Sequence, residues 1–565
     1  MVELRPIGRR QQVKTANGRP ATMIHDTPFP ALTSARAVIN RAYLYDEIRQ
    51  LDTLLAFTKL SEREQAQVEA LARQLVNTVR KAVWARGGID VLLHEYDLST
   101  EEGIVLMCLA EALLRIPDAA TADRLIQDKL SGAEWDRHLG HSASFFVNAS
   151  TWGLLLTGKL VKLETSSSLF NRLISRSGEP VIRLAIKQAM RLIGHQFVMG
   201  NTLDEALTRG RKDENRHYRY SFDMLGEAAL TAADAERYFA AYHHAIATLG
   251  KEAGEGDLFD HPGISVKLSA LHPRYEYTQR QRVLDELSPR LLALALAAKA
   301  ANLSMTIDAE EAERLDLSLD LFASVFCNDE LTGWNGFGLA VQAYQKRAVH
   351  VIDWLAQLAS QCKRQIPVRL VKGAYWDSEI KLAQERGLDG YPVFTHKAAT
   401  DVSYLACAHR LLGSGDLFYP QVVTHNARTF ATLIVMAGSR PFEFQRLHGM
   451  GEALYSAVFD GHPQFNCRVY APVGNYQELL PYLVRRLLEN GANSSFVNQI
   501  ANEQISVDEI IADPVKELEH RPVHIPMPRY LYGQERLNSK GINLADTEAQ
   551  KYLSEVLEAA CQQCW

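Results

Sequence analysis

Hydrophobic and polar residues follow two different periods along this chain, and the change falls near residue 217. Before it, apolar residues recur at the spacing of helices. Ser61 to Glu64 has the form of a capping box. The apolar positions that follow it are Val68, Leu71, Leu75, Val76 and Val79. We therefore predict a helical arm or domain over residues 36–215, preceded by a disordered or extended arm over residues 1–35.

Eight short, β-rich apolar runs alternate with helical segments beyond residue 217. The runs are "YRYSFDML", "GISVKLSAL", "SMTIDAE", "GFGLAVQAY", "PVRLVKGAY", "FYPQVVTHN", "FEFQRLHGM" and "CRVYAPVG". Buried parallel strands are expected to be apolar, as these runs are. Eight strand–helix units in about 280 residues fit a (β/α)8 TIM-type barrel of the α/β class, which takes about 250. We place the barrel at residues 216–505 and a C-terminal connector at 506–565.

Nine polar residues fall late in these runs, at the strand ends that build the active site of a barrel enzyme. They are Asp223, Lys267, Asp308, Gln342, Arg369, Lys372, Thr424, His425 and Tyr470, and the apolar Leu447 holds the matching place in the seventh run. A single polar residue at such a place is commonly a core residue whose hydrogen bonds are satisfied. Nine polar residues at equivalent places in eight strands favour a catalytic barrel.

Composition narrows the function further. A net charge of −6 with 47% apolar residues is typical of a globular protein and argues against a dedicated nucleic-acid binder. No apolar run approaches the ~20 residues that span a bilayer, and no secretion signal is present. We expect a cytoplasmic protein, with peripheral contact as its closest approach to a membrane. The seven scattered cysteines predict reduced thiols, and no residue set has metal-ligand spacing.

The cations around the predicted barrel mouth favour an anionic ligand. In "VKGAYWD" a Lys and a Gly follow a strand and precede a helix, which can present N–H groups to a pyrophosphate. "FTHKAAT" opens another helix with Thr395, His396 and Lys397, which can hold phosphate or ribose. A Rossmann fingerprint is absent, because "GWNGFG" precedes a strand rather than following one. Together these motifs fit a large phosphorylated cofactor across the mouth.

Arg485 and Arg486 stand side by side in "VRRLLENGANSSFVNQ". The pair is either a solvated helix face or a clamp for a carboxylate or phosphate, which the guanidinium fork suits. The motif alone leaves both open.

Four stretches resemble the proline dehydrogenase barrel of the bacterial proline utilization A enzymes. They are "ISVKLSALHPRY", "VRLVKGAYWDSEIK", "YPVFTHKAATDVSYLACA" and "YLVRRLLENGANSSFVN", and the resemblance covers about residues 60 to 535. It implies a distorted (β/α)8 barrel that binds FAD. It also implies oxidation of L-proline to Δ1-pyrroline-5-carboxylate, with electrons passed to a membrane quinone of the ubiquinone type.

The resemblance also implies roles at the substrate site. Arg485, Arg486 and Lys267 would bind the substrate carboxylate, and Glu489 would hold the arginines. Tyr375, Leu447 and Tyr470 would wall the pyrrolidine ring, with Asp308 tying the pocket together by hydrogen bonds.

A second set would hold the cofactor. Arg369 would lie near flavin N5 and Gln342 would face the isoalloxazine, with Asp308 beside them. The other residues implied are Lys372, Gly373, Ala374, Trp376, Thr395, His396, Lys397, Thr424, His425 and Asn426. Some relatives carry Arg where His396 stands, and a neutral His would give a weaker phosphate contact.

Two departures from the pattern of the full family limit the functions that the resemblance implies. No ribbon–helix–helix module is visible, so DNA binding is not expected. "IPMPRYLYGQERLNSKGINLADTEAQ" resembles the connector into an aldehyde dehydrogenase domain, which is absent here. We expect a truncated form of a bifunctional enzyme or a natural single-activity chain, and the sequence predicts no oligomeric state.

Two other functions stay open. One is an aldolase-type barrel that uses Lys267 or Lys372 as a Schiff-base amine. The other is a non-enzymatic regulator that binds nucleic acid through the basic residues of the arm, which are Arg5, Arg9, Arg10, Lys14 and Arg19.

Overall fold

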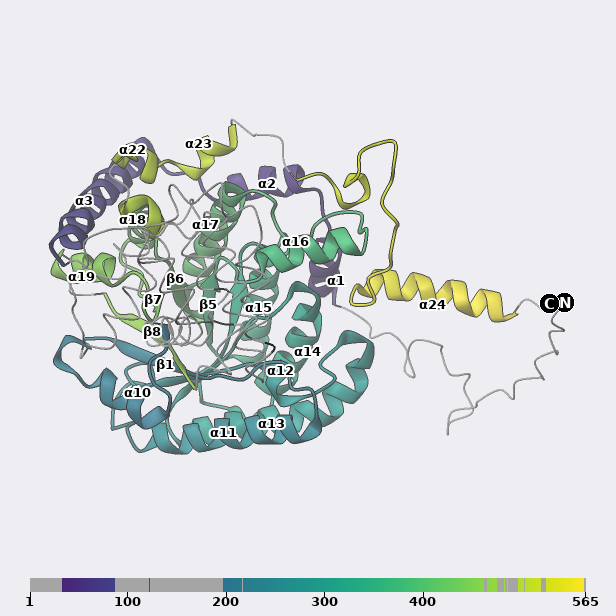
Figure 1. Cartoon of the computed structure of the whole chain (residues 1–565). Helices are drawn as coiled ribbons and strands as arrows, with labels where there is room; N and C mark the ends of the chain where they lie inside the picture. Colours follow the sequence, from purple (N-terminus) through teal and green to yellow (C-terminus); the bar gives the residue numbers. More distant parts are fainter. Residues whose placement is uncertain are drawn as a thin grey trace.

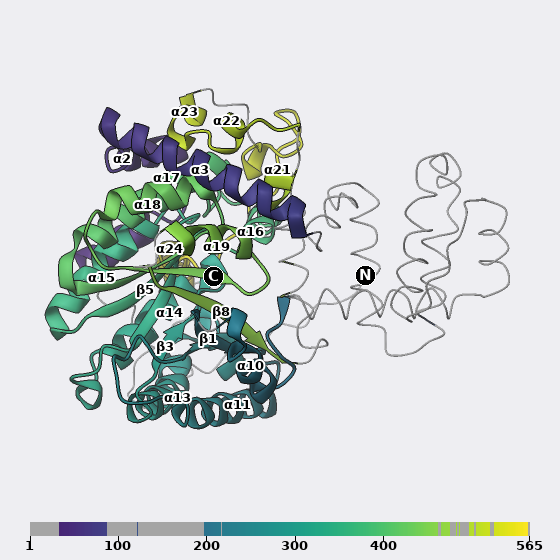
Figure 2. The same ribbon diagram turned by 90° about the vertical axis from the view of Figure 1, so that its left-hand side faces the viewer.

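A closed barrel of eight parallel strands, in chain order, forms the centre of the computed structural model of this chain (Figures 1 and 2). The structure describes residues 33–86, 121, 197–215, 217–461, 465–474, 482, 485, 496–501, 504–519 and 525–562. The strands are β1 Arg219–Met224, β2 Gly263–Val266, β3 Ser304–Ile307, β4 Phe337–Gln342, β5 Ile366–Val371, β6 Phe418–Val423, β7 Glu443–Leu447 and β8 Cys467–Val473. All eight predicted runs form strands, and the predicted fold class is confirmed.

The two faces of the barrel strands differ in polarity. Arg369 on β5 hydrogen-bonds to Ser221 on β1, Ser265 on β2 and Gln445 on β7, so these residues point into the barrel. Successive strand residues point to opposite faces, and the outward neighbours of the three are Phe222, Ile264 and Phe444, all buried. The expectation of apolar strands is therefore right for the outward face and wrong for the interior, which is polar.

Helices cover the outside of the barrel (Figure 1). The helices of the barrel are α11 Ala232–Gly250, α12 Leu268–Leu271, α13 Arg280–Ala300, α14 Leu315–Phe326, α15 Ala348–Cys362, α16 Trp376–Glu385, α17 Lys397–Gly413, α18 Ala427–Ala437 and α19 Glu452–Gly461. The helices before and after it are α1 Ser34–Arg41, α2 Glu47–Leu55, α3 Glu62–Arg86, α10 Leu203–Gly210, α21 Phe496–Ala501, α22 Val507–Ile510, α23 Pro514–Glu519 and α24 Thr547–Gln562. The segment that carries Arg485 and Arg486 is predicted as a helix over residues 476–490, and of this range the structure describes only residues 482 and 485.

The N-terminal helices pack on the barrel rather than standing apart from it. Helix α1 contacts α15, α2 contacts α17, and α3 contacts α18 and α19. The predicted capping box starts α3: the Glu64 carboxylate accepts the backbone N–H of Ser61 at 2.8 Å, and the Ser61 hydroxyl accepts the backbone N–H of Glu64 at 3.3 Å. Figure 2 shows α2 and α3 lying over α17 and α18. The exact domain boundaries stay predictions.

The C-terminal segment returns to the first helix. Asn40 donates to the Thr547 hydroxyl at 2.6 Å, and Asn543 donates to the Tyr43 hydroxyl at 2.9 Å. From there α24 projects to one side of the barrel (Figure 1). Within the described part of the chain, none of the helices combines the length and the apolar character needed to cross a membrane.

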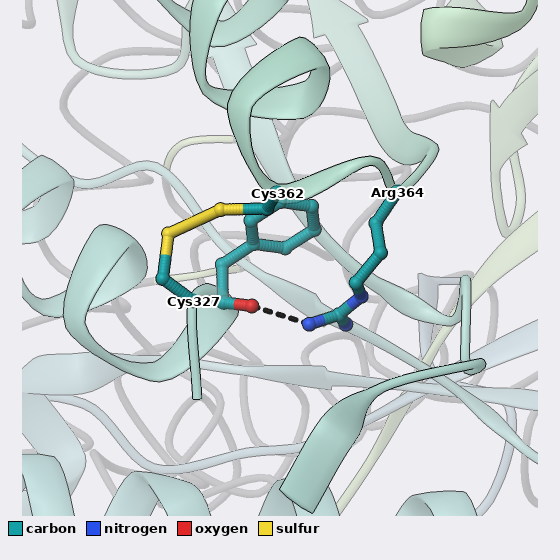
Figure 3. The surroundings of a disulfide bond; sticks show 4 residues. Cys327, Cys362 and Arg364 are labelled. Carbon is teal, nitrogen blue, oxygen red and sulfur yellow. Dashed lines mark hydrogen bonds between the residues drawn. A yellow bond between two sulfur atoms is a disulfide. The ribbon is translucent and has the colours of Figure 1, made fainter. Parts of the chain in front are cut away.

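A disulfide joins Cys327, which follows α14, to Cys362, the last residue of α15 (Figure 3). Beside it, Arg364 donates to the carbonyl oxygens of Phe326 and Trp334, the latter at 2.9 Å. The expectation that all cysteines are reduced is wrong for this pair, because the fold brings the end of α14 and the end of α15 together, with the two Cα atoms 5.9 Å apart across a sequence separation of 35. By closing that loop, the bond restricts the unfolded chain.

Glu379 on α16 should make stability depend on pH. Its side chain is buried, with Oε1 accepting the backbone N–H of Ala312 at 2.6 Å, and burial raises its pKa to about 7. The cost of ionising it in the folded state is absent below about pH 4.5 and grows until about pH 7.

Glu379→Gln keeps the acceptor and removes the charge. We expect the free energy of unfolding of this variant to exceed that of the parent at pH 8, by about 3 kcal/mol at most, and the difference to vanish near pH 4.5. Urea unfolding at several pH values measures this. The exposed Glu385 on the same helix supplies the control variant Glu385→Gln, and a pH-independent difference for Glu379→Gln would contradict the prediction.

Candidate active site

Four of the predicted site residues meet with Asp223 at the carboxyl ends of the strands. The Lys267 ammonium donates to Asp223 at 2.7 Å, to Asp308 at 3.1 Å and to the Tyr470 hydroxyl at 3.1 Å. The same hydroxyl lies 2.6 Å from Asp308 and 2.8 Å from Asp223. Arg369 donates to the other oxygen of Asp308 at 2.8 Å. Strands β1, β5 and β8 and the residues after β2 and β3 thus converge on one buried cluster.

The charges of this cluster balance, with two cations facing two carboxylates. Burial raises the pKa of Asp223, and Lys267 opposes that shift. Burial by itself lowers the pKa of Lys267, but the charges of Asp223 and Asp308 outweigh it and raise that pKa above its usual value. Lys267 therefore stays protonated. All three of its N–H bonds are engaged, so any attraction for a substrate carboxylate acts through its charge.

Arg369 is fixed from several strands at once. Besides Asp308, it donates to Ser265 and Ser221 at 3.0 Å each and to Gln445 at 2.8 Å. Its guanidinium carbon lies 5.3 Å from the centroid of the Tyr470 ring. A planar fork held at every edge keeps a positive charge at one place under the mouth.

Arg485 lies against Tyr375, another residue of the predicted substrate site. Its guanidinium carbon is 4.9 Å from the centroid of the Tyr375 ring, as expected if both residues line one pocket. It pairs with Glu227 through two hydrogen bonds of 2.9 and 3.0 Å. Burial raises the pKa of Glu227, but Arg485 more than offsets this and holds it below its usual value. Arg486 and Glu489 lie outside the described residues, so their predicted roles stay predictions.

Leu447 and Tyr470 contact one small apolar cluster. Its buried members are Phe197, Val198, Leu225, Met450 and Tyr482. Tyr482, three residues before Arg485, packs in this cluster with Leu447 of β7 and Tyr470 of β8. Leu447 and Tyr470 are thus neighbours, as a shared ring pocket requires.

Further residues predicted to line the cofactor lie at the end of β4 and directly after β5. Gln342 donates to the carbonyl oxygen of Glu310 at 2.7 Å and accepts the N–H of Ala374 at 3.2 Å. Gly373 has φ of +148°, and a Cβ there would lie 2.4 Å from the Tyr344 ring. Only glycine fits this backbone. Lys372 forms an ion pair with Asp401 on α17.

In this structure, the loop that is predicted to bind phosphate binds a carboxylate side chain of the protein itself. The Glu47 carboxylate on α2 accepts the Thr395 N–H at 3.0 and 3.1 Å and the Thr395 hydroxyl at 3.1 Å. Lys346 lies 3.9 Å from the same carboxylate. The donors of this loop therefore suit an oxyanion, as a helix N-terminus does.

The neighbours of Thr395 have structural contacts of their own. The His396 ring accepts the Ala398 N–H at 3.2 Å and so caps α17. Trp376 donates to the Phe394 carbonyl at 2.8 Å. Burial lowers the pKa of Lys397, with Asp401 opposing and Lys372 reinforcing the shift. Two lysines and one carboxylate are thus gathered beside the loop.

Thr424, His425 and Asn426 shape the turn after β6. The Thr424 hydroxyl accepts the Asn426 N–H at 3.2 Å, and the Asn426 side chain accepts the Thr429 N–H at 2.9 Å to start α18. His425 accepts the Leu447 N–H at 3.1 Å, which ties this turn to the end of β7. The contacts are structural, and a part in cofactor binding stays a prediction.

Several residues of the site had no role in the sequence prediction. The sequence marks Asp223 only by its place late in a run, and it assigns no role to Ser221, Ser265, Gln445, Glu227 or Glu47. The two-residue period of a strand offered one signal, because Ser221 shares a face with Asp223, and Ser265 with Lys267. No local pattern marks Glu227 or Glu47. In the described part of the chain, no group of three or more His, Cys, Asp or Glu side chains is placed to hold a metal ion.

Comparison with known proteins gives the family. Residues 206–499 match the family model of proline dehydrogenase. The chain belongs to the proline dehydrogenase family. Residues 33–80 match the model of the proline utilization A proline dehydrogenase N-terminal domain, and residues 88–197 match one described as the DNA-binding domain of proline dehydrogenase. The resemblance read from the motifs is confirmed, and the barrel is an enzyme domain of this family.

Relatives carry the likeness over nearly the whole chain. The bifunctional protein PutA of Salmonella typhimurium and that of Escherichia coli are each 50% identical over 555 residues, which are 94% of this chain and 42% of theirs. This chain thus spans less than half the length of these relatives. Proline dehydrogenase 1 of Bacillus subtilis is 26% identical over 314 residues, which are 54% of this chain and 90% of the relative.

Solved structures agree. A mutant of proline utilization A from Bradyrhizobium japonicum is 50% identical, with a TM-score of 0.73 over 92% of this chain and 53% of that one. A proline utilization A structure with proline bound in remote sites is 49% identical, with a TM-score of 0.73 over 95% of this chain and 54% of that one.

The match at residues 88–197 bears on the expectation that the chain does not bind DNA. That expectation rested on the missing ribbon–helix–helix pattern, whereas the matching model carries DNA binding in its description. Except for Thr121 and Phe197, these residues lie outside the described part of the chain. The expectation therefore stays a prediction, and so does the cytoplasmic location.

Proposed function

We propose that this chain catalyses the FAD-dependent oxidation of L-proline to Δ1-pyrroline-5-carboxylate and passes the electrons to a membrane quinone. This is the first step from proline to glutamate. The observation that carries the proposal is the buried cluster of Lys267, Asp308, Arg369 and Tyr470 at the carboxyl ends of the strands. Membership of the proline dehydrogenase family supports it.

The substrate side of the pocket follows from charge and shape. Arg485 offers a guanidinium fork for the carboxylate of proline, and Arg486 is its expected partner. Tyr375, Tyr470 and Leu447 would enclose the ring and exclude water. Positioning is the main task, since hydride transfer from a held ring needs orientation more than acid–base groups. Glu227 now accepts both bonds of the Arg485 fork, so proline would have to share or replace this carboxylate.

The donor set fits the cofactor. Thr395 already holds a carboxylate oxygen at its N–H and hydroxyl, which is the contact expected for a phosphate. Lys372 and Lys397 would add positive charge, and Gly373 leaves room for close approach. Gln342, Arg369 and Ala374 would lie along the ring, with Trp376, His396, Thr424, His425 and Asn426 around it. When bound, FAD supplies the two-electron acceptor for the hydride of proline.

The alternative of a Schiff-base aldolase is weakened by electrostatics. A lysine that attacks a carbonyl must lose its proton, which calls for a lowered pKa. Lys267 lies between Asp223 and Asp308, and its pKa is raised instead. Lys372 is paired with Asp401. Neither amine is prepared for that reaction.

The spectrum of the purified protein tests the proposal. We expect bound flavin that bleaches when L-proline is added anaerobically and recovers with a soluble quinone. Acid precipitation should leave FAD in the supernatant, because no His or Cys is identified as a covalent link. D-proline serves as the control for a shaped pocket. Protein that binds FMN only, or flavin that L-proline does not bleach, would overturn the proposed function.

A further inference from the structure

A chain of hydrogen bonds runs down the inside of the barrel from the candidate active site. Arg369 donates to the Gln445 side-chain oxygen at 2.8 Å, and the Gln445 amide nitrogen donates to Glu443 at 2.9 Å. Arg468 donates to both oxygens of Glu443, at 2.9 and 3.2 Å. Each of these residues is at most 3% exposed. These hydrogen bonds connect the four side chains without bridging water.

The order of charges along this series of hydrogen bonds fixes the side-chain amide of Gln445 in one orientation. Its nitrogen must face the Glu443 carboxylate, which only accepts, so its oxygen must face Arg369, which only donates. The reverse orientation would set oxygen against carboxylate and N–H against guanidinium. Gln445 is therefore a directed acceptor for the Nε of Arg369, and Glu443 sets its direction. Arg468 in turn neutralises Glu443 and donates to the backbone of Tyr220, Phe259 and His261.

We infer that Gln445 is a positioning residue for the reaction, which fixes the charge of Arg369 against the reacting ring of the cofactor. The inference rests on the proposed function, because it assumes that Arg369 lies at the flavin. A cation held there stabilises the electron-rich reduced ring. If Arg369 lost its Nε partner, the guanidinium would be held only through its Nη groups and its charge would be less well placed.

Gln421 offers a matched control. It is a glutamine on the neighbouring strand β6, equally buried, and it donates to the same Glu443 oxygen at 3.1 Å. It lies opposite Arg369 in the pairing of β5 with β6, but none of the described side-chain hydrogen bonds joins the two residues. Gln445→Met and Gln421→Met therefore remove the same group from the same carboxylate, and only the first removes an acceptor from Arg369.

The midpoint potential of the bound flavin is the decisive readout, since it is a property of the loaded site and not of the folded fraction. Gln445→Met should shift the equilibrium about tenfold toward oxidised flavin, which is a potential about 30 mV lower. The rate of flavin reduction at saturating L-proline should fall about tenfold, with little change in KM. Gln421→Met should leave potential and rate near those of the parent. Equal potentials in both variants and the parent, or equal shifts in both variants, would overturn the inference.

A double-mutant cycle shows whether Gln445 acts through Arg369. In an Arg369→Met background, Gln445→Met should shift the potential no further. A full additional shift would mean that Gln445 acts independently, against the inference. If the Met variant does not fold, Gln445→Glu keeps the size of the side chain, and ionisation of the new carboxyl should lower the potential increasingly toward high pH. A potential that matches the parent from pH 6 to 9 would overturn the inference. A parent protein without bleachable flavin would instead refute the proposed function.

Discussion

Replacement of Lys267 with Met is expected to abolish proline oxidation and to lower the free energy of unfolding by about 3–5 kcal/mol, the usual result of removing one partner of a buried ion pair. Lys267 lies within 2.7 Å of Asp223 and 3.1 Å of Asp308. Without it, two carboxylates remain in the cluster with only Arg369 to balance them. Urea unfolding gives the loss of stability, and L-proline turnover with a dye acceptor gives the activity.

The loss should depend on pH. Burial already raises the pKa of Asp223, and removal of Lys267 raises it further because the attraction that opposed burial is gone. A carboxyl with a raised pKa in the folded state costs nothing when protonated and destabilises as it ionises. The variant should therefore lose more stability at pH 8 than at pH 5.

Lys346 supplies the control for loss of a buried lysine. Its side chain is 5% exposed, but its nearest carboxylate, Glu47, lies 3.9 Å away and is held by Thr395. Lys346→Met should cost less than about 1 kcal/mol, as expected for a weak pair. Similar losses in the two variants would show that the Lys267 contacts contribute nothing beyond the burial of a lysine.

Replacement of Arg485 with Met is expected to lower kcat/KM for L-proline by roughly one to two decades, because a hydrogen bond to a charged group is worth about 1.5–3 kcal/mol. Pyrrolidine lacks the carboxylate, so its turnover should fall much less. Binding of carboxylate inhibitors should weaken in parallel. Flavin content is measured for each variant, so that loss of cofactor is not mistaken for loss of the substrate contact.

The effect of an unpaired Glu227 must be distinguished from the loss of the substrate contact of Arg485. Arg485→Met leaves the Glu227 carboxylate without its partner, and a stranded negative charge would repel the substrate carboxylate. The double variant with Arg485→Met and Glu227→Gln removes that repulsion. If Arg485 binds proline, the double variant stays impaired. Recovery of kcat/KM to the parent value would show that Arg485 serves only to neutralise Glu227.

Strand positions were predictable because buried parallel strands leave short apolar runs. Residues late in those runs were predictable as site residues because a barrel brings all strand ends to one rim. Lys267, Asp308, Arg369 and Tyr470 were found in this way and meet in the structure. Predicting which residues lie at the strand ends requires the topology of a barrel, but not the distances between side chains.

The partners of these residues were not predictable in the same way. Ser221, Ser265 and Gln445 reach Arg369 from three strands that are 76 to 148 residues away in the chain. Glu47 reaches Thr395 across 348 residues, and Glu227 reaches Arg485 across 258. A serine or glutamine at such a distance leaves no local periodicity that differs from an ordinary polar position.

The amino-acid sequence by itself determined the eight strands, their order, the polar rim and the family, because each depends on local periodicity or on contiguous motifs. Only the tertiary structure decided that the barrel interior is a polar chain from Arg369 to Arg468, that Lys267 is shared between two carboxylates, and that Cys327 bonds to Cys362. The polar contacts depend on which side chains closure of the barrel brings within about 3 Å, the range of a hydrogen bond. The disulfide depends on the placement of the ends of α14 and α15. That closeness is a property of packing between distant segments, and no single segment encodes it.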